Sequence, residues 1–126
     1  MSTRVIAAAA GLFYVATGLW AFLDPASFAG SVATFSPYNR HLLHDSGAFS
    51  VGLGFALLIA AWTSEGLRVT LLAVLAASLL HLGSHIEDIN LGGRPATDIP
   101  ILALPCVVIA VGVVAASRRA ARTVKN

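Results

Sequence analysis

The sequence predicts an all-α protein, an antiparallel bundle of four transmembrane helices. Of its 126 residues, 57% are hydrophobic and 11% are charged, and the mean hydropathy is +0.82, whereas roughly a quarter of the residues in a soluble domain are charged. The apolar residues form four long stretches separated by polar turns. Lipid requires backbone groups to be paired within the segment, as they are in a helix. Since a span takes about 20 residues, the chain has room for four.

The spans are expected over residues 5–23, 40–62, 67–89 and 98–116, in a bundle that occupies residues 1–117 and precedes a basic tail at 118–126. The first span is bounded by Arg4 and by the step Asp24-Pro25, because proline disfavours the helical conformation of the residue before it. A cleaved signal peptide is the alternative for this segment. Its run of about 19 apolar residues exceeds the 7 to 15 of a signal peptide, so we expect the segment to be retained.

Turn residues separate the second and third spans. The second starts near Arg40 and ends before the polar turn at 63–66, after which the third begins. The glycine pair at 92–93 is expected to end the third span. The longer connection at 24–39 contains aromatic residues that indicate a loop or short helix in the outer interface.

The fourth span opens at a cap and contains two prolines. Thr97 or Asp98 is expected to be its N-cap, with Pro100 just inside the helix. Pro105 is expected to kink the helix slightly. Cys106 is the only cysteine, so no intrachain disulfide can form and we expect a small apolar packing residue.

Basic residues set the orientation. With four spans, both termini lie on one side, and that side would carry six of the eight basic residues: Arg4, Arg68, Arg118, Arg119, Arg122 and Lys125. Only Arg40 and Arg94 remain opposite, so the positive-inside rule places both termini in the cytoplasm. The basic tail is expected to touch the anionic headgroups of the lipid bilayer rather than nucleic acid. The alanine-rich, lysine-poor composition fits the cytoplasmic (inner) membrane of a high-GC bacterium.

All four histidines fall into two clusters, each at the outer end of a span. Residues three and four apart share a helix face, so the second span carries one polar patch and the third a polar stripe that begins at Ser78. Two antiparallel helices with a short connection are expected to pack side by side, which would bring the clusters together at comparable depth. The residues expected to converge on one site are His41, His44, Asp45, His81, His85 and Asp88.

These residues suggest a metal site, because ionisable groups inside a membrane are costly and mark function by default. Imidazoles with nearby carboxylates are good ligands for zinc, copper, iron or manganese. One alternative is a structural or proton-handling network in which Arg40 or Arg94 neutralises the acids. Another is contact with a quinone or with haem, which would take one histidine from each helix. The spacing lacks the glutamate of the HExxH motif and no other catalytic signature is present, so the sequence does not decide whether the protein is an enzyme.

Small residues are expected to hold the helices together. Spaced four apart, they align on one face and let a neighbouring backbone approach closely. The sets at this spacing are Ser46, Ser50 and Gly54 in the second span, Ala7 and Gly11 in the first, and Ala73 and Ala77 in the third. A homodimer could use the same kind of face. Tyr14, in the first span, is expected to pack with its hydroxyl bonded locally.

Two stretches resemble a known group of proteins. The end of the first span, Gly-Leu-Trp-Ala-Phe-Leu-Asp-Pro at residues 18–25, and the stretch VGLGFALLIAAW at 51–62 are similar to small four-helix bacterial membrane proteins of the DoxX-like group. The resemblance covers the first half of the chain. It implies a four-helix fold, and some members of that group are linked to respiratory or sulfur redox chemistry.

Two functions remain open from the sequence. The first is a metal-binding or redox protein in which the four histidines are ligands and Asp45 and Asp88 bridge or orient them. The second is an accessory subunit that packs against a larger membrane complex and uses these residues for structural hydrogen bonds.

Overall fold

The structure, a computed structural model, describes residues 2–123, with side chains as far as Arg118. The described chain is all-helical, as expected. Its five helices are α1 (Thr3–Leu23), α2 (Pro25–Ser31), α3 (Arg40–Thr63), α4 (Leu67–Glu87) and α5 (Pro95–Thr123). Four of them, all but α2, are long and apolar enough to cross a membrane, which makes this a multi-pass membrane protein by length and composition.

The outside of the bundle is apolar, as contact with lipid requires. Large hydrophobic side chains on every long helix are exposed, and the most exposed include Trp62 at 83%, Phe49 at 77% and Leu80 at 76%. In water such a surface would be unfavourable by roughly 25 cal/mol for each Å² of apolar area. A bilayer removes that penalty, because its acyl chains are as apolar as leucine.

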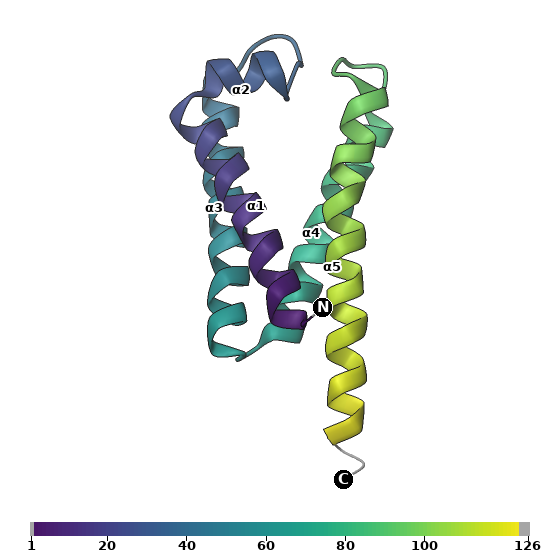
Figure 1. The fold of residues 1–126 in the computed structure, drawn as a ribbon. Helices are drawn as coiled ribbons and strands as arrows, with labels where there is room; N and C mark the ends of the chain where they lie inside the picture. The colour runs from purple at the N-terminus through teal and green to yellow at the C-terminus, as the bar shows by residue number, and fades with distance from the viewer. Residues whose placement is uncertain (1, 124–126) are drawn as a thin grey trace.

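The four long helices form two arms (Figure 1). The α1–α3 arm and the α4–α5 arm meet at the end that carries the start of α1 and the α3–α4 turn, here called the termini end, and they diverge toward α2. Apolar side chains from all four helices fill the junction. The buried members of this core are Ala7, Ala10, Leu57, Ala61, Leu71, Val74 and Ile109. The opposite end, where α2 lies and α3 and α5 begin, is called the histidine end.

Glycines determine which helices pair most closely. A Cβ added to Gly54 would lie 2.7 Å from the carbonyl oxygen of Gly11, and one added to Gly47 would lie 2.7 Å from that of Gly18. The two backbones of the α1–α3 arm are therefore in direct contact at two levels, seven residues apart on each helix. The expected small-residue packing is present at Gly11, Ser50 and Gly54, since a Cβ added to Gly18 would lie 2.9 Å from Ser50 Cβ. Gly18 and Gly47, which the search at spacing four did not include, complete the seam.

The second and third spans are not the close neighbours that their short connection led us to expect. The glycine face of α3 is covered by α1, and α4 packs mainly against α5. In the turn between them, Ser64 and Gly66 both adopt left-handed conformations, with φ of 65° and 60°. A tight turn thus sends α4 away from α3, and the chain forms two hairpin-like arms instead of a regular up-and-down bundle.

Arg4 closes the termini end of the α1–α3 arm. Its Nε donates to the carbonyl oxygen of Ala61 at 2.6 Å and its Nη2 to that of Trp62 at 2.9 Å. The last carbonyls of a helix lack intrahelical partners and carry partial negative charge. The arginine that bounds the first span in the sequence therefore also caps the end of α3.

At the histidine end, the 24–39 connection does contain a short helix. Asp24 caps α2 by accepting a hydrogen bond from the backbone N–H of Ser27 at 3.1 Å, and Pro25 occupies the first helical position. Beyond α2, the Arg94 guanidinium donates to the carbonyl oxygen of Ser31, and Phe35 lies against Gly93. These two contacts link the arms where their helices have diverged.

Two helix ends differ from the expected ones. The third span ends at Glu87, so the Gly92-Gly93 pair forms the following turn, with φ of 134° and 78°. The fourth span begins at Pro95 rather than at residue 97 or 98. Proline is favoured at the first position of a helix, and the buried Asp98 carboxylate caps this start by accepting a hydrogen bond from the Arg94 N–H at 2.7 Å. It continues to Thr123, since leaving lipid does not end a helix. The rest of the expected tail lies outside the described residues.

Candidate functional site

The α3 cluster, His41, His44 and Asp45, lies at the start of its helix, and among the described residues its side chains contact only residues of the α1–α3 arm. Asn39 caps α3 by accepting from the Leu42 N–H at 3.0 Å. His41 Nε2 lies 3.5 Å from Asp45 Oδ2, one turn further on, and both side chains are largely exposed. The His44 ring instead packs against Phe22 of α1, with centroids 5.1 Å apart. The patch therefore divides into an exposed pair and a histidine held against α1.

The α4 cluster stands near the end of its helix. His81 and His85, one turn apart, have ring centroids separated by 5.0 Å and planes inclined by 63°. His85 also makes an edge-to-face contact with Phe35, with ring centroids 5.4 Å apart and ring planes inclined by 81°. His81 is exposed and His85 is half-buried. The segment that follows α2 thus holds one imidazole of the pair in place.

The stripe on α4 faces the other arm at its deeper end. Tyr14 Oη lies 2.7 Å from Ser78 Oγ, and Ser78 Oγ donates to the carbonyl oxygen of Val74 at 2.6 Å. Because a hydroxyl has only one proton, Tyr14 is the donor to Ser78. The sequence analysis expected the Tyr14 hydroxyl to be bonded locally, but it is bonded across the two arms. The sequence contains no signal for this pairing.

The six candidate residues are brought together only in pairs. His41 meets Asp45, and His81 meets His85, whereas Asp88 is exposed at the end of α4. Among residues 2–118, no group of three or more His, Cys, Asp or Glu side chains is placed to hold a metal ion. Both clusters lie at the histidine end, as expected from antiparallel helices, but each has its own neighbours. Metal binding by these residues stays a prediction.

Of the pairs, the one on α4 is better suited to ligation. Two imidazoles at positions i and i+4 can direct one nitrogen each toward a common point beside the helix, at the 2.0 to 2.1 Å that a zinc ion requires. The α3 pair combines one imidazole with one carboxylate, and its contact already accounts for both groups. The arrangement therefore offers two imidazole ligands at His81 and His85, while His41 and Asp45 contact each other.

Comparison of the chain with family models, with curated proteins and with solved structures gave no match. The fold and composition define the class, an all-helical multi-pass membrane protein. The resemblance to DoxX-like proteins stays a prediction.

Proposed function

We propose that the protein is a multi-pass protein of the bacterial inner membrane that binds a transition-metal ion through His81 and His85. The observation that carries the proposal is the adjacency of the two rings, with centroids 5.0 Å apart on one face of α4. One of them is fixed by Phe35, which reduces the entropy that ligation would otherwise cost. By the distribution of basic residues, the termini lie in the cytoplasm and the site on the outer side.

The proposed site would have open coordination positions. Neutral imidazole nitrogens suit zinc, copper, iron and manganese to different degrees, and two protein ligands leave the remaining positions to water, a substrate or a donor from another chain. Such a site fits a metal carrier or a redox centre. His41, His44, Asp45 and Asp88 would add ligands only in a state in which the arms approach each other at the histidine end.

A second candidate is a non-catalytic accessory subunit of a larger membrane complex, in which the same residues form a polar network. The contacts already present favour it: His41 is paired with Asp45, and His44 packs on Phe22. These contacts accommodate the imidazoles without any ion. The exposed apolar faces of the helices would then meet a partner protein or a second copy as well as lipid.

Elemental analysis of protein purified in detergent without added metal, together with its absorption spectrum, separates the candidates. We expect stoichiometric metal that is lost in a His81→Ala, His85→Ala double variant and retained in the matched His41→Ala, His44→Ala double variant. Loss of metal in both variants would indicate a site shared by the two clusters. A metal-free and colourless protein, whose two variants melt differently from the parent, would favour the accessory subunit.

A further inference from the structure

The α4 histidine pair supplies too few ligands to complete a metal site by itself. A structural zinc site has four protein ligands, and a catalytic one has three and a water, whereas this pair supplies two, His81 and His85. Among residues 2–118, no third His, Cys, Asp or Glu side chain is placed to join them. If the pair binds a metal ion, as proposed above, further ligands must come from outside the chain.

The nitrogens of the pair are available for ligation. In the described part of the chain, His81 and His85 contact each other's ring and the ring of Phe35, and no hydrogen bond engages their side-chain nitrogens. His41, by contrast, is paired with Asp45. Polar groups without a partner are costly in a membrane, so a metal ion would satisfy groups that the chain itself leaves unsatisfied.

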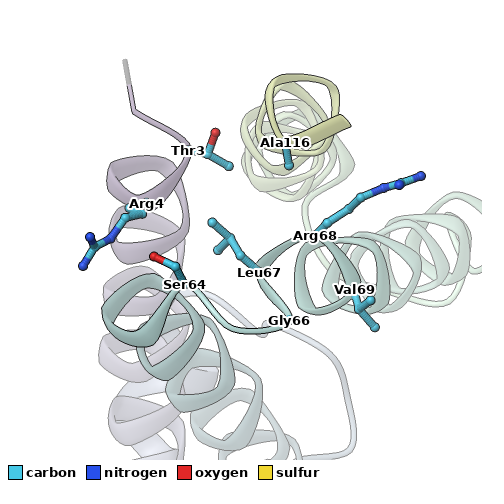
Figure 2. Close-up of a pocket in the computed structure, with 8 residues that line it drawn as sticks. All are labelled: Thr3, Arg4, Ser64, Gly66, Leu67, Arg68, Val69 and Ala116. Carbon is cyan, nitrogen blue, oxygen red and sulfur yellow. The ribbon is translucent and has the colours of Figure 1, made fainter. Parts of the chain in front are cut away.

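The helix that carries the pair is covered on one side only. Figure 2 shows Leu67, at the start of α4, projecting toward α1, and Val69 projecting away from it. Further along the covered side, Leu71, Val74 and Ser78 are buried. Within the apolar stretch of α4, 17% of the residues are buried, against 22% to 33% in the other three long helices. Of the four, α4 therefore has the largest share of its residues left for a neighbour outside the chain.

His81 lies at the edge of the covered side of α4. Ser78 and His85, at spacings of three and four from it, are buried and half-buried, whereas His81 itself is exposed. Ser84, three residues beyond His81, is exposed as well. Residues at these spacings share a helix face, so a second molecule that approaches over Ser84 can reach the His81 ring.

A second copy of the chain would bring the missing ligands to the same depth. Copies in one membrane share one orientation, so a two-fold axis that relates them is normal to the membrane and their α4 helices run parallel. His81 and His85 of both copies then lie at one level. Such an interface is isologous, so each copy contributes the same two imidazoles and the ion receives four, the number in a closed tetrahedral site.

The charge of the ion also has a counterpart at this place. Four neutral imidazoles leave a zinc ion with both of its positive charges. Asp88, three residues beyond His85, is exposed at the end of α4, and a dimer contains two such carboxylates. Carboxylates close to histidine ligands orient the rings and raise their basicity, so the two Asp88 side chains match the ion in both charge and position.

We propose that one metal ion joins two copies of the chain through His81 and His85 of each, which makes the protein a metal-bridged homodimer. The proposal rests on the proposed function, because it assigns the missing ligands of the same site to a second copy. The coordination positions that one chain leaves open are then filled by the other.

Native mass spectrometry of the detergent-solubilised protein counts the chains and the ions in each complex. After removal of metal with EDTA, the protein is titrated with zinc and, in parallel, with copper. We expect one ion for every two chains and no dimer before metal is added. One ion bound to a single chain would overturn the dimer and leave the proposed function intact, whereas no bound ion in either series would overturn both. A dimer that forms equally well without metal would overturn the bridging role.

Two double variants test the ligands. His81→Ala, His85→Ala should lose the metal-dependent dimer, because no imidazole of the pair remains on either copy. The matched variant His41→Ala, His44→Ala removes the same number of imidazoles from the other cluster and should dimerise as the parent does. Equal dimerisation of the two double variants would overturn the proposal.

Two tryptophan variants test the approach of the second copy with all histidines in place. Ser84→Trp puts a bulky side chain on the exposed face beside His81, so the dimer should be lost. Gly83→Trp is its matched control, because residue 83 lies on the opposite side of the helix from His81 and an added Cβ there would meet nothing within 4 Å. It should keep the dimer, and the proposal is wrong if both tryptophan variants dimerise alike.

Discussion

The glycine seam of the α1–α3 arm predicts the largest effect of a single methyl group in this chain. In Gly54→Ala, the new Cβ would lie 2.7 Å from the Gly11 carbonyl oxygen and 2.8 Å from the Val15 backbone nitrogen. Both atoms belong to the backbone of α1, so no rotamer change can make room. The helices must separate, and overpacking of this kind costs about 1 to 3 kcal/mol.

Gly52→Ala is the matched control, because Gly52 lies in the same helix and a Cβ there would meet nothing within 4 Å. Both substitutions gain the same helix propensity, about 1 kcal/mol of alanine over glycine, so the difference between the two variants isolates the steric cost. We expect Gly54→Ala to be less stable than Gly52→Ala by about 1 to 3 kcal/mol.

Unfolding by sodium dodecyl sulfate from mixed micelles, followed by circular dichroism, measures this difference. A Gly47→Ala variant should behave like Gly54→Ala, since its Cβ would lie 2.7 Å from the Gly18 carbonyl oxygen. Equal stability of Gly54→Ala and Gly52→Ala would show that the two backbones are not in contact, and the pairing of α1 with α3 would have to be abandoned.

Three further substitutions test individual contacts. Tyr14→Phe removes the donor to Ser78 and should lower stability by about 0.5 to 1.5 kcal/mol, with a coupling in the double-mutant cycle with Ser78→Ala; additive effects would contradict the bond. Asp98→Ala removes the acceptor of the Arg94 N–H and should cost about 1 kcal/mol, visible as faster hydrogen exchange at the start of α5; unchanged exchange there would argue against it. Arg4→Gln leaves the last carbonyls of α3 without their side-chain donor and should lower the stability by about 1 kcal/mol, with faster hydrogen exchange confined to the end of α3. Exchange at the end of α3 as slow as in the parent protein would refute that role.

Hydropathy and turn residues were sufficient to predict the class and most helix boundaries. The start of α3 at Arg40 and of α4 at Leu67 agree with the sequence, because a charged residue and a polar turn mark the places where apolar stretches stop. The start of α5 was misjudged because Pro95 and Pro100 are both compatible with a first turn. Only the Asp98 contact with the preceding backbone distinguishes them.

Helix pairing could not be predicted from the length of the connections. The information was present in the spacing of seven between Gly11 and Gly18 and between Gly47 and Gly54, but a search at spacing four does not find it. A short connection restricts the distance between helix ends and not the angle between their axes. The candidate site depended on that angle, so the sequence could locate both histidine clusters at one end but not their neighbours.

The order in which the helices pair has a consequence for biogenesis. Residues 3–63 contain both sides of the glycine seam, and residues 67–123 contain both helices of the other arm. Each long helix therefore has its closest partner within its own half of the chain. The two helices of a half can pair as soon as both have left the translocon, before the rest of the polypeptide is inserted. Two separately translated fragments, divided at the Ser64–Gly66 turn, should accordingly associate in the bilayer through the shared apolar junction.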